Sequence, residues 1–157
     1  MAAARWLDHP EARLWQGYRD VRRELQRAFD RQLLVDAGLS GAEYALLVPL
    51  SESPERVLRM RDLGWMLGWD RSRLSHQIRR MEKRGLVARE ECADDARGFM
   101  VRLTDAGRAA IEAAAPAHVE TVRKYFFDLL SEDERATLTD VFERIVERLM
   151  RDVPSGK

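Results

Sequence analysis

The stretch Asp70-Arg-Ser-Arg-Leu-Ser-His-Gln-Ile-Arg-Arg-Met-Glu-Lys-Arg-Gly-Leu-Val87 decides the fold that the sequence predicts. Its apolar residues Leu74, Ile78 and Met81 repeat at steps of four and three, the spacing of one buried face on an α-helix. The first residue of the stretch is a suitable N-cap, and Gly85 is a suitable end. The sequence therefore predicts a helix that buries one side and exposes the other.

The same segment concentrates positive charge in a chain that is neutral overall. The chain carries 27 basic and 27 acidic residues, whereas residues 71–84 hold six basic residues and the single acid Glu82, a local charge of +5. Polar and basic side chains on the outward side of such a helix can donate hydrogen bonds to phosphates and to base edges in a DNA major groove. The candidate DNA-binding residues of this helix are Arg71, Ser72, Arg73, Ser75, His76, Arg79 and Arg80.

A second short helix is expected just before this one. It covers residues 61–67 and ends at Gly68, and its inward side chains are Leu63, Met66 and Leu67. Two short helices joined by a tight glycine turn form a helix-turn-helix.

A β-hairpin is expected directly after the basic helix. Residues 87–92 and 99–103 are rich in β-compatible side chains, and residues 93–98 between them are rich in turn-forming residues. This turn carries Arg97, which adds a basic group at the tip of the hairpin.

The region before the helix-turn-helix predicts one more helix and a short strand. Ser40 and Glu43 form an S-x-x-E capping box, and Pro49 is expected to end or kink the helix that begins there. A very short strand is expected from Val57 to about Met60.

Long helices are expected at both ends of the chain, each with a narrow apolar seam suited to packing along another helix. The first covers residues 10–36, with Pro10 in its first turn and Gly38 at its end. Its seam consists of Leu14, Tyr18, Val21, Leu25 and Ala28.

The C-terminal region predicts two further helices. Thr104 caps the first, and Pro116 inside it predicts a kink or break. Its apolar residues are Ile111, Val119, Val122, Phe126 and Leu129. Ser131 and Glu134 form another capping box, which starts the second helix. The seam of that helix consists of Leu138, Phe142, Ile145 and Leu149. Because the chain is too short to bury both terminal seams internally, they predict a homodimer.

Two blocks of sequence carry a family resemblance. Residues 70–87 resemble the recognition-helix signature of the MarR regulators. Asp95-Ala-Arg-Gly98, followed by Val101-Arg-Leu-Thr-Asp-Ala-Gly107, is similar to that family's wing and the start of its fifth helix. The order of elements matches the family along essentially the whole chain, although His76 and Gln77 stand where basic and apolar residues are frequent.

The resemblance implies a dimer built from the terminal helices, which binds a pseudo-palindromic operator in double-stranded DNA and is often released by a small effector. It also implies that Arg97 enters the minor groove, with Asp95 orienting it. The predicted fold is mostly α-helical with a small β-hairpin wing, in a single domain over residues 1–157. A winged helix-turn-helix lobe is expected over residues 40–104, with dimerisation helices over residues 10–36 and 105–151.

The predicted function is that of a sequence-specific transcriptional regulator, as a repressor. The rival interpretation is a winged-helix module that binds a protein without binding DNA, and it predicts a neutral recognition helix. A solvated basic face is the plainest alternative for the charge itself. An enzyme is not expected, because the sequence has no phosphate loop, histidine cluster or G-x-S-x-G motif. No cofactor or metal is expected either, and a ligand-blind and a ligand-responsive regulator both stay open.

A cytoplasmic protein is expected, because no apolar run reaches the roughly 20 residues of a membrane span and the start lacks a signal-peptide core. The single cysteine, Cys92, is expected to be a packed or bystander thiol. The larger aromatic residues are expected in the core, with an effector cleft as the alternative for some of them: Trp15, Tyr18, Tyr44, Trp65, Trp69 and Phe126.

Overall fold

The basic helix forms as predicted, as α4 (Arg71–Lys83), in a computed structural model that describes residues 4–91 and 98–152. The side chain of Asp70 accepts a hydrogen bond from the backbone N–H of Arg73 at 2.8 Å, which caps the helix. Gly85 follows its end with a φ of 71°, a value that favours glycine. The three predicted core residues of this helix are buried: Leu74, Ile78 and Met81.

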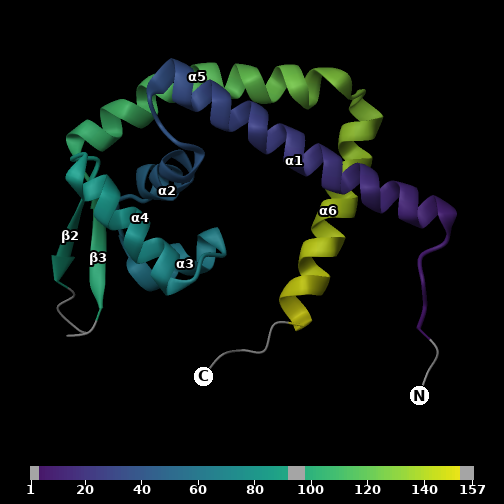
Figure 1. The fold of residues 1–157 in the computed structure, drawn as a ribbon, viewed down its shortest axis with the longest axis horizontal. Coiled ribbons are helices and arrows are strands. Elements are labelled where there is room, and N and C mark those ends of the chain that lie inside the picture. Colours follow the sequence, from purple (N-terminus) through teal and green to yellow (C-terminus); the bar gives the residue numbers. More distant parts are fainter. Residues whose placement is uncertain (1–3, 92–97, 153–157) are drawn as a thin grey trace. The chain divides into compact units, whose positions relative to one another are not determined.

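The chain divides into two units, Met1–Val119 and Glu120–Lys157, and α5 (Asp105–Tyr125) runs from the first into the second (Figure 1). Besides most of α5 and all of α4, the first unit contains α1 (His9–Ala37), α2 (Gly41–Glu52), β1 (Val57–Arg59), α3 (Met60–Leu67), β2 (Val87–Glu91) and β3 (Phe99–Leu103). The second contains the 3-10 helix η1 (Phe127–Leu129) and α6 (Glu132–Asp152).

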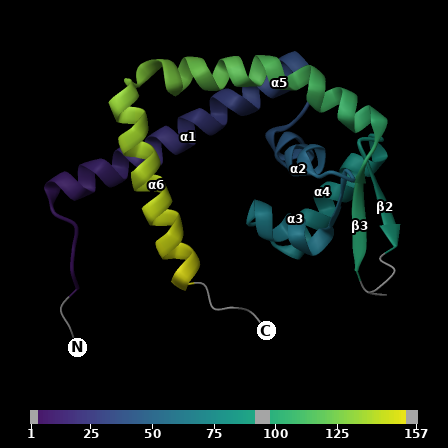
Figure 2. The ribbon, with the colours of Figure 1, turned by 180° about the vertical axis from the view of Figure 1, so that it is seen from behind.

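The predicted hairpin is part of a three-stranded antiparallel sheet with the order β1-β3-β2. Val87 pairs with Leu103 at the open end of the hairpin, close to the end of α4, and Val57 of β1 pairs with Arg102. Figure 2 shows the hairpin beside α4, with α3 next to that helix. The order helix, turn, helix, hairpin that the sequence predicts is therefore confirmed.

One hydrophobic core holds the helices and the sheet of the first unit together. Its fully buried large side chains come from α1, α2, α3 and α4, from the turn after α1 and from β3: Leu33, Leu39, Leu46, Leu47, Leu50, Leu63, Leu74, Ile78, Met81 and Val101. Because α3 and α4 both contribute to this core, the helix-turn-helix is fixed to the rest of the lobe by apolar burial.

The predicted helix ends are confirmed where capping residues mark them. Gly38 ends α1 in the left-handed region with φ 62°, and the Ser40–Glu43 capping box starts α2. The Oγ of Thr104 accepts a hydrogen bond from the Gly107 N–H at 3.0 Å at the start of α5. At the start of α1 a second capping box joins Asp8 and Glu11, a box that the sequence reasoning missed.

The predicted end of α2 at Pro49 and the predicted break of α5 at Pro116 do not occur. Helix α2 continues past Pro49 to Glu52, and α5 runs without a break through Pro116. A proline removes one ladder hydrogen bond and crowds the preceding turn. Pro49 is itself buried with its helical neighbours Leu46 and Leu50, so apolar packing offsets that cost. In α5 the turn before Pro116 is anchored by two buried residues, Ile111 and Ala114.

The fifth helix is also shorter than its apolar pattern suggests. It ends at Tyr125, so Phe126 lies between it and η1, and Leu129 belongs to η1. The Phe126 and Phe127 rings meet edge to face at 5.3 Å, which shows that the apolar pattern continues through a change of helix type.

Several predicted core residues are exposed in the single chain. Met66 is 52% exposed. Helix α3 has only eight residues, and the side that it turns to the core carries Met60 and Leu63. Trp65, Trp15 and Tyr18 are also exposed, and the last two stack on each other at 5.3 Å on α1. The prediction that these three aromatics are core residues is therefore wrong for the single chain.

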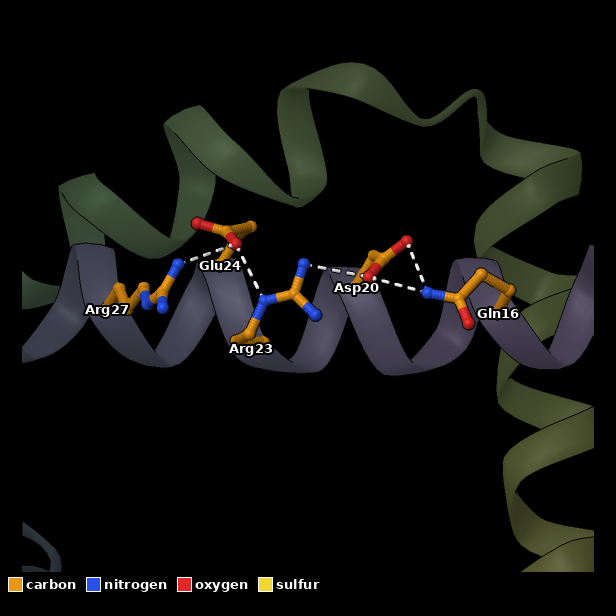
Figure 3. A network of polar contacts seen from close by, with 5 residues as sticks. All are labelled: Gln16, Asp20, Arg23, Glu24 and Arg27. Atoms are coloured by element: carbon orange, nitrogen blue, oxygen red, sulfur yellow. Dashed lines mark hydrogen bonds and ion pairs between the residues drawn. The ribbon is translucent and has the colours of Figure 1, made fainter.

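Helix α1 presents a polar side satisfied by its own contacts and an exposed apolar seam. A chain of hydrogen bonds and ion pairs at 2.8–3.0 Å joins Gln16, Asp20, Arg23, Glu24 and Arg27 along the helix (Figure 3). The seam residues on the first half of the helix remain exposed: Leu14, Tyr18 and Val21. The polar contacts are local and exposed, so they support the helix itself.

Helix α6, in the second unit, likewise exposes most of its predicted seam. Phe142, Ile145 and Leu149 are 46%, 52% and 61% exposed, while Leu138 is half-buried.

Among the described residues no single helix is long and apolar enough to cross a membrane. Taken together, α1 and α2 reach that length and composition, but the pair bends by 81°.

Substitution of Gly107 by alanine is expected to destabilise the lobe. Gly107 is buried where α5 starts, and an added Cβ would lie 2.0 Å from the carbonyl oxygen of Leu86, which is backbone and cannot move aside cheaply. We expect Gly107→Ala to lower the free energy of unfolding by about 3 kcal/mol. Chemical denaturation measures the change.

Gly17→Ala is the matched control, because an added Cβ there meets no described atom within 4 Å on the exposed surface of α1. It is expected to raise the free energy of unfolding by up to about 1 kcal/mol, the helix propensity difference. Equal stability of Gly107→Ala and the wild type would contradict the packing at the start of α5.

Candidate nucleic-acid interface

The outward face of α4 carries the predicted DNA-binding side chains. Six of the seven are exposed and Ser75 is half-buried. The exposed ones are Arg71, Ser72, Arg73, His76, Arg79 and Arg80. Lys83 is exposed too, and the helical period places it on the same face as Ser72 and His76. The candidate list from the sequence omitted Lys83, although the spacing of seven from His76 was available to find it.

Not all of the local charge of the segment is free. Arg84 points away from the outward face and pairs with Glu43 of α2 at 2.7 Å. The one acid of the segment, Glu82, is paired with Arg89 of β2 at 2.7 Å. The basic side chains that remain on α4 are Arg71, Arg73, Arg79, Arg80 and Lys83. The exposed face of α4 is therefore strongly basic, and the one acid of the helix is already paired.

Arg73 is held in place by an aromatic ring. Its guanidinium carbon lies 4.3 Å from the centre of the Trp69 ring, and Trp69 is half-buried against the core. A guanidinium that stacks on a ring keeps its N–H groups free in the ring plane and loses rotational freedom. The contact therefore orients Arg73 before any partner binds. Sequence reasoning assigned Trp69 to the core and missed this second role, although the spacing of four residues was visible.

A recess of about 700 Å³ adjoins the start of α4. It lies between α3, the turn after it and the start of β3. Its lining combines an apolar floor with arginines, including Arg61, Trp65, Trp69, Arg71, Leu74 and Phe99. Trp65 is 72% exposed at this place, so the apolar surface continues out of the recess.

Three predictions fall on residues outside the described part of the chain. Asp95, Arg97 and Cys92 belong to residues 92–97, so the roles proposed for the tip of the wing and for the thiol stay predictions. The described parts of the hairpin pair as far as Glu91 and Phe99, and the Arg89 guanidinium lies 5.4 Å from the Phe99 ring.

A second polar cluster lies where α1, α2 and α5 meet. The Nδ1 of His118 is 3.2 Å from the Oε1 of Gln32, and its ring lies 4.5 Å from Tyr44 and 5.2 Å from Phe29. Burial lowers the pKa of His118 below its ordinary value of 6.5, so the imidazole is neutral at pH 7.

Among the described residues no group of three or more histidine, cysteine or acidic side chains could hold a metal ion.

A helix-turn-helix, a hairpin directly after its second helix, and basic side chains on the exposed face of that helix define the winged helix-turn-helix class. The model of the MarR family matches residues 37–98, which include α2, α3, α4 and β2.

Solved structures extend the match to nearly the whole chain. Sco3205, a MarR family transcriptional regulator of Streptomyces coelicolor solved in complex with DNA, is 39% identical with a TM-score of 0.91, over 98% of this chain and 97% of that one. AbsC, another MarR family regulator of that organism, is 38% identical with a TM-score of 0.89, over 95% of this chain and 100% of that one.

A curated relative, the uncharacterized HTH-type transcriptional regulator YdgJ of Bacillus subtilis, is 31% identical over 108 residues, 69% of this chain. That match spans 64% of the length of YdgJ, and the matches to further curated Bacillus relatives span 47% of theirs. The chain belongs to the MarR family of transcriptional regulators.

Proposed function

We propose that this chain binds double-stranded DNA in a sequence-specific manner and regulates transcription, with α4 in the major groove. The observation that carries the proposal is the set of basic side chains on the exposed face of α4, one of them held by Trp69. Arginine side chains oriented in this way can donate two hydrogen bonds to a guanine edge. The DNA complex of Sco3205 supports the assignment, because that protein is similar over almost the entire chain.

We propose further that the protein acts as a homodimer on a pseudo-palindromic operator. The exposed apolar seams of α1 and α6 support this, because a monomer gains nothing from keeping such stripes in water. Residues 10–36 and 105–151 would then serve dimerisation, and residues 40–104 DNA binding, within a single domain over residues 1–157. Half-sites are expected about one helical turn apart, roughly 10 base pairs.

The wing is proposed to contact the minor groove through Arg97, with Asp95 orienting that side chain. Release by a small effector is proposed too, and PcaV of Streptomyces coelicolor, which is 27% identical, was solved in complex with its natural ligand. We propose repression as the sign of regulation and the cytoplasm as the compartment. A winged-helix module for protein contacts is disfavoured, because the exposed face of α4 is basic rather than neutral.

Substitution of Arg97 tests the proposed DNA contact of the wing. Loss of this charge from both wings of a dimer is expected to weaken binding to related and unrelated duplexes alike. It should also flatten the slope of log K against log salt by about 2 units, since each phosphate contact contributes about 0.9. Fluorescence anisotropy of Arg97→Ala at several salt concentrations measures both quantities.

Arg5→Ala is the control, because Arg5 is an exposed arginine outside the ranges proposed for DNA binding and for dimerisation. An unchanged affinity and slope for Arg97→Ala would remove the wing from the interface. A wild-type protein that binds every duplex equally would remove sequence specificity from the proposal.

A further inference from the structure

One buried carboxylate joins the ends of three helices. The side chain of Glu43 is 5% exposed and accepts hydrogen bonds from the backbone N–H of Ser40 at 2.8 Å and from its hydroxyl at 3.0 Å. Nη1 of Arg84 lies 2.7 Å from both oxygens of the same carboxylate. Nη2 of Arg84 donates to the carbonyl oxygen of Gly38 at 3.0 Å. We call these four residues the Arg84 clasp.

The clasp bridges segments that lie far apart in the sequence. Gly38 is the C-cap of α1, Ser40 is the N-cap of α2, and Arg84 is the C-cap of α4. Burial alone would raise the pKa of Glu43, but the hydrogen bonds from Ser40 and Arg84 outweigh it and hold that pKa below its ordinary value. Glu43 is therefore ionised at pH 7, and the contact is a charge-assisted one.

We propose that Arg84 is a positioning residue for DNA recognition, which fixes the end of α4 against the corner between α1 and α2 and does not bind DNA itself. The proposal rests on the proposed function. It separates Arg84 from its basic neighbours on α4, because Arg80 and Lys83 are exposed and form no ion pair within the described residues.

The physical reason is directional. The apolar contacts of Leu74, Ile78 and Met81 hold α4 to the core, but apolar contacts are non-directional and tolerate small rotations of a helix. The Arg84 guanidinium is planar and meets acceptors on two segments, so it fixes the orientation of the end of α4. A base-reading side chain depends on that orientation, whereas a charge that attracts phosphates depends on it much less.

The test compares three variants of the full chain, Arg84→Gln, Lys83→Gln and Ile111→Ala, on two duplexes of equal length. One duplex is selected from a random pool by the wild type and the other is unrelated to it. Arg84→Gln is expected to lower affinity for the selected duplex about tenfold. Its affinity for the unrelated duplex and its salt slope should stay at the wild-type values.

The two controls distinguish the positioning effect from the loss of a positive charge and from a loss of folding stability. Lys83→Gln is expected to weaken binding to both duplexes and to flatten the salt slope, because Lys83 lies on the exposed face. Ile111→Ala creates a cavity in the core outside α4 and the Arg84 clasp and lowers the melting temperature, while the ratio of the two affinities stays unchanged. Arg84→Lys is expected to restore only part of that ratio, because an ammonium cannot reproduce the planar contact.

Two results would overturn the proposal. One is a flattened salt slope for Arg84→Gln equal to that of Lys83→Gln, which would make Arg84 a phosphate contact. The other is an unchanged ratio of the two affinities. Hydrogen exchange without DNA distinguishes this failure from failure of the proposed function. Amides in the last turn of α4 should exchange faster in Arg84→Gln than in Lys83→Gln. Equal exchange rates would show that Arg84 does not hold the end of α4, even if the wild type binds DNA specifically.

Discussion

Ile145→Glu is expected to convert the protein to a monomer and to abolish tight binding to a palindromic operator. Ile145 is 52% exposed on α6, between the seam residues Phe142 and Leu149. If two chains pack through this seam, the substitution places one unpaired carboxylate per chain in an apolar interface. Each costs about 3 kcal/mol or more, so the two together cost about 6 kcal/mol of dimer stability. Sedimentation and DNA binding of the variant measure the effect.

Ala136→Glu is the matched control for this prediction. Ala136 is exposed on the same helix, about 150° around the axis from the seam by the helical period, so it adds the same charge outside the proposed interface. The control should remain dimeric at the concentration where Ile145→Glu is monomeric. A dimer of unchanged affinity in Ile145→Glu would assign dimerisation to another surface.

Arg73→Ala is expected to cost about 1 to 3 kcal/mol of binding free energy per half-site, and Arg79→Ala the same, if each side chain meets a base. A symmetric dimer has two half-sites, so the loss on a full operator is about 2 to 6 kcal/mol. For Arg73 we expect a value near the upper end. The Trp69 ring already holds its guanidinium at 4.3 Å, so little conformational entropy is lost on binding.

The same substitutions should change sequence preference as well as affinity. A lost base contact relaxes preference at one position in each half-site, whereas a lost phosphate contact weakens binding to all sequences equally. Competition between duplexes that differ at one position distinguishes the two. Uniform weakening by both variants would make Arg73 and Arg79 phosphate contacts and leave base reading to other residues.

Local patterns of sequence were enough to predict the elements that place this site. The apolar spacing of Leu74, Ile78 and Met81 and the caps at Asp70 and Ser40 depend on residues within one helical turn. Contacts from distant parts of the chain do not alter these local patterns. The helix-turn-helix and the hairpin were therefore predicted in their correct order. Charge counting also found the basic helix, because its arginines are close in the sequence.

The features that the sequence did not predict depend on contacts between segments that are distant in the sequence. Arg84 counted toward the basic cluster, yet its partner Glu43 lies 41 positions earlier, and nothing in the local sequence marks the pair. Pro49 was predicted to end or kink its helix because propensity is local, whereas the burial that keeps α2 intact comes from the tertiary core. The exposed aromatics Trp15 and Trp65 were assigned to the core for the same reason.

Selection of bound sequences from a random DNA pool tests the central claim most directly. If the protein reads DNA with α4 as a symmetric dimer, the wild type should enrich a palindromic consensus with half-sites roughly 10 base pairs apart. Arg73→Ala should enrich the same consensus with one position per half-site lost. A pool that stays random after repeated rounds with the wild type would contradict the account, and so would a consensus without two-fold symmetry.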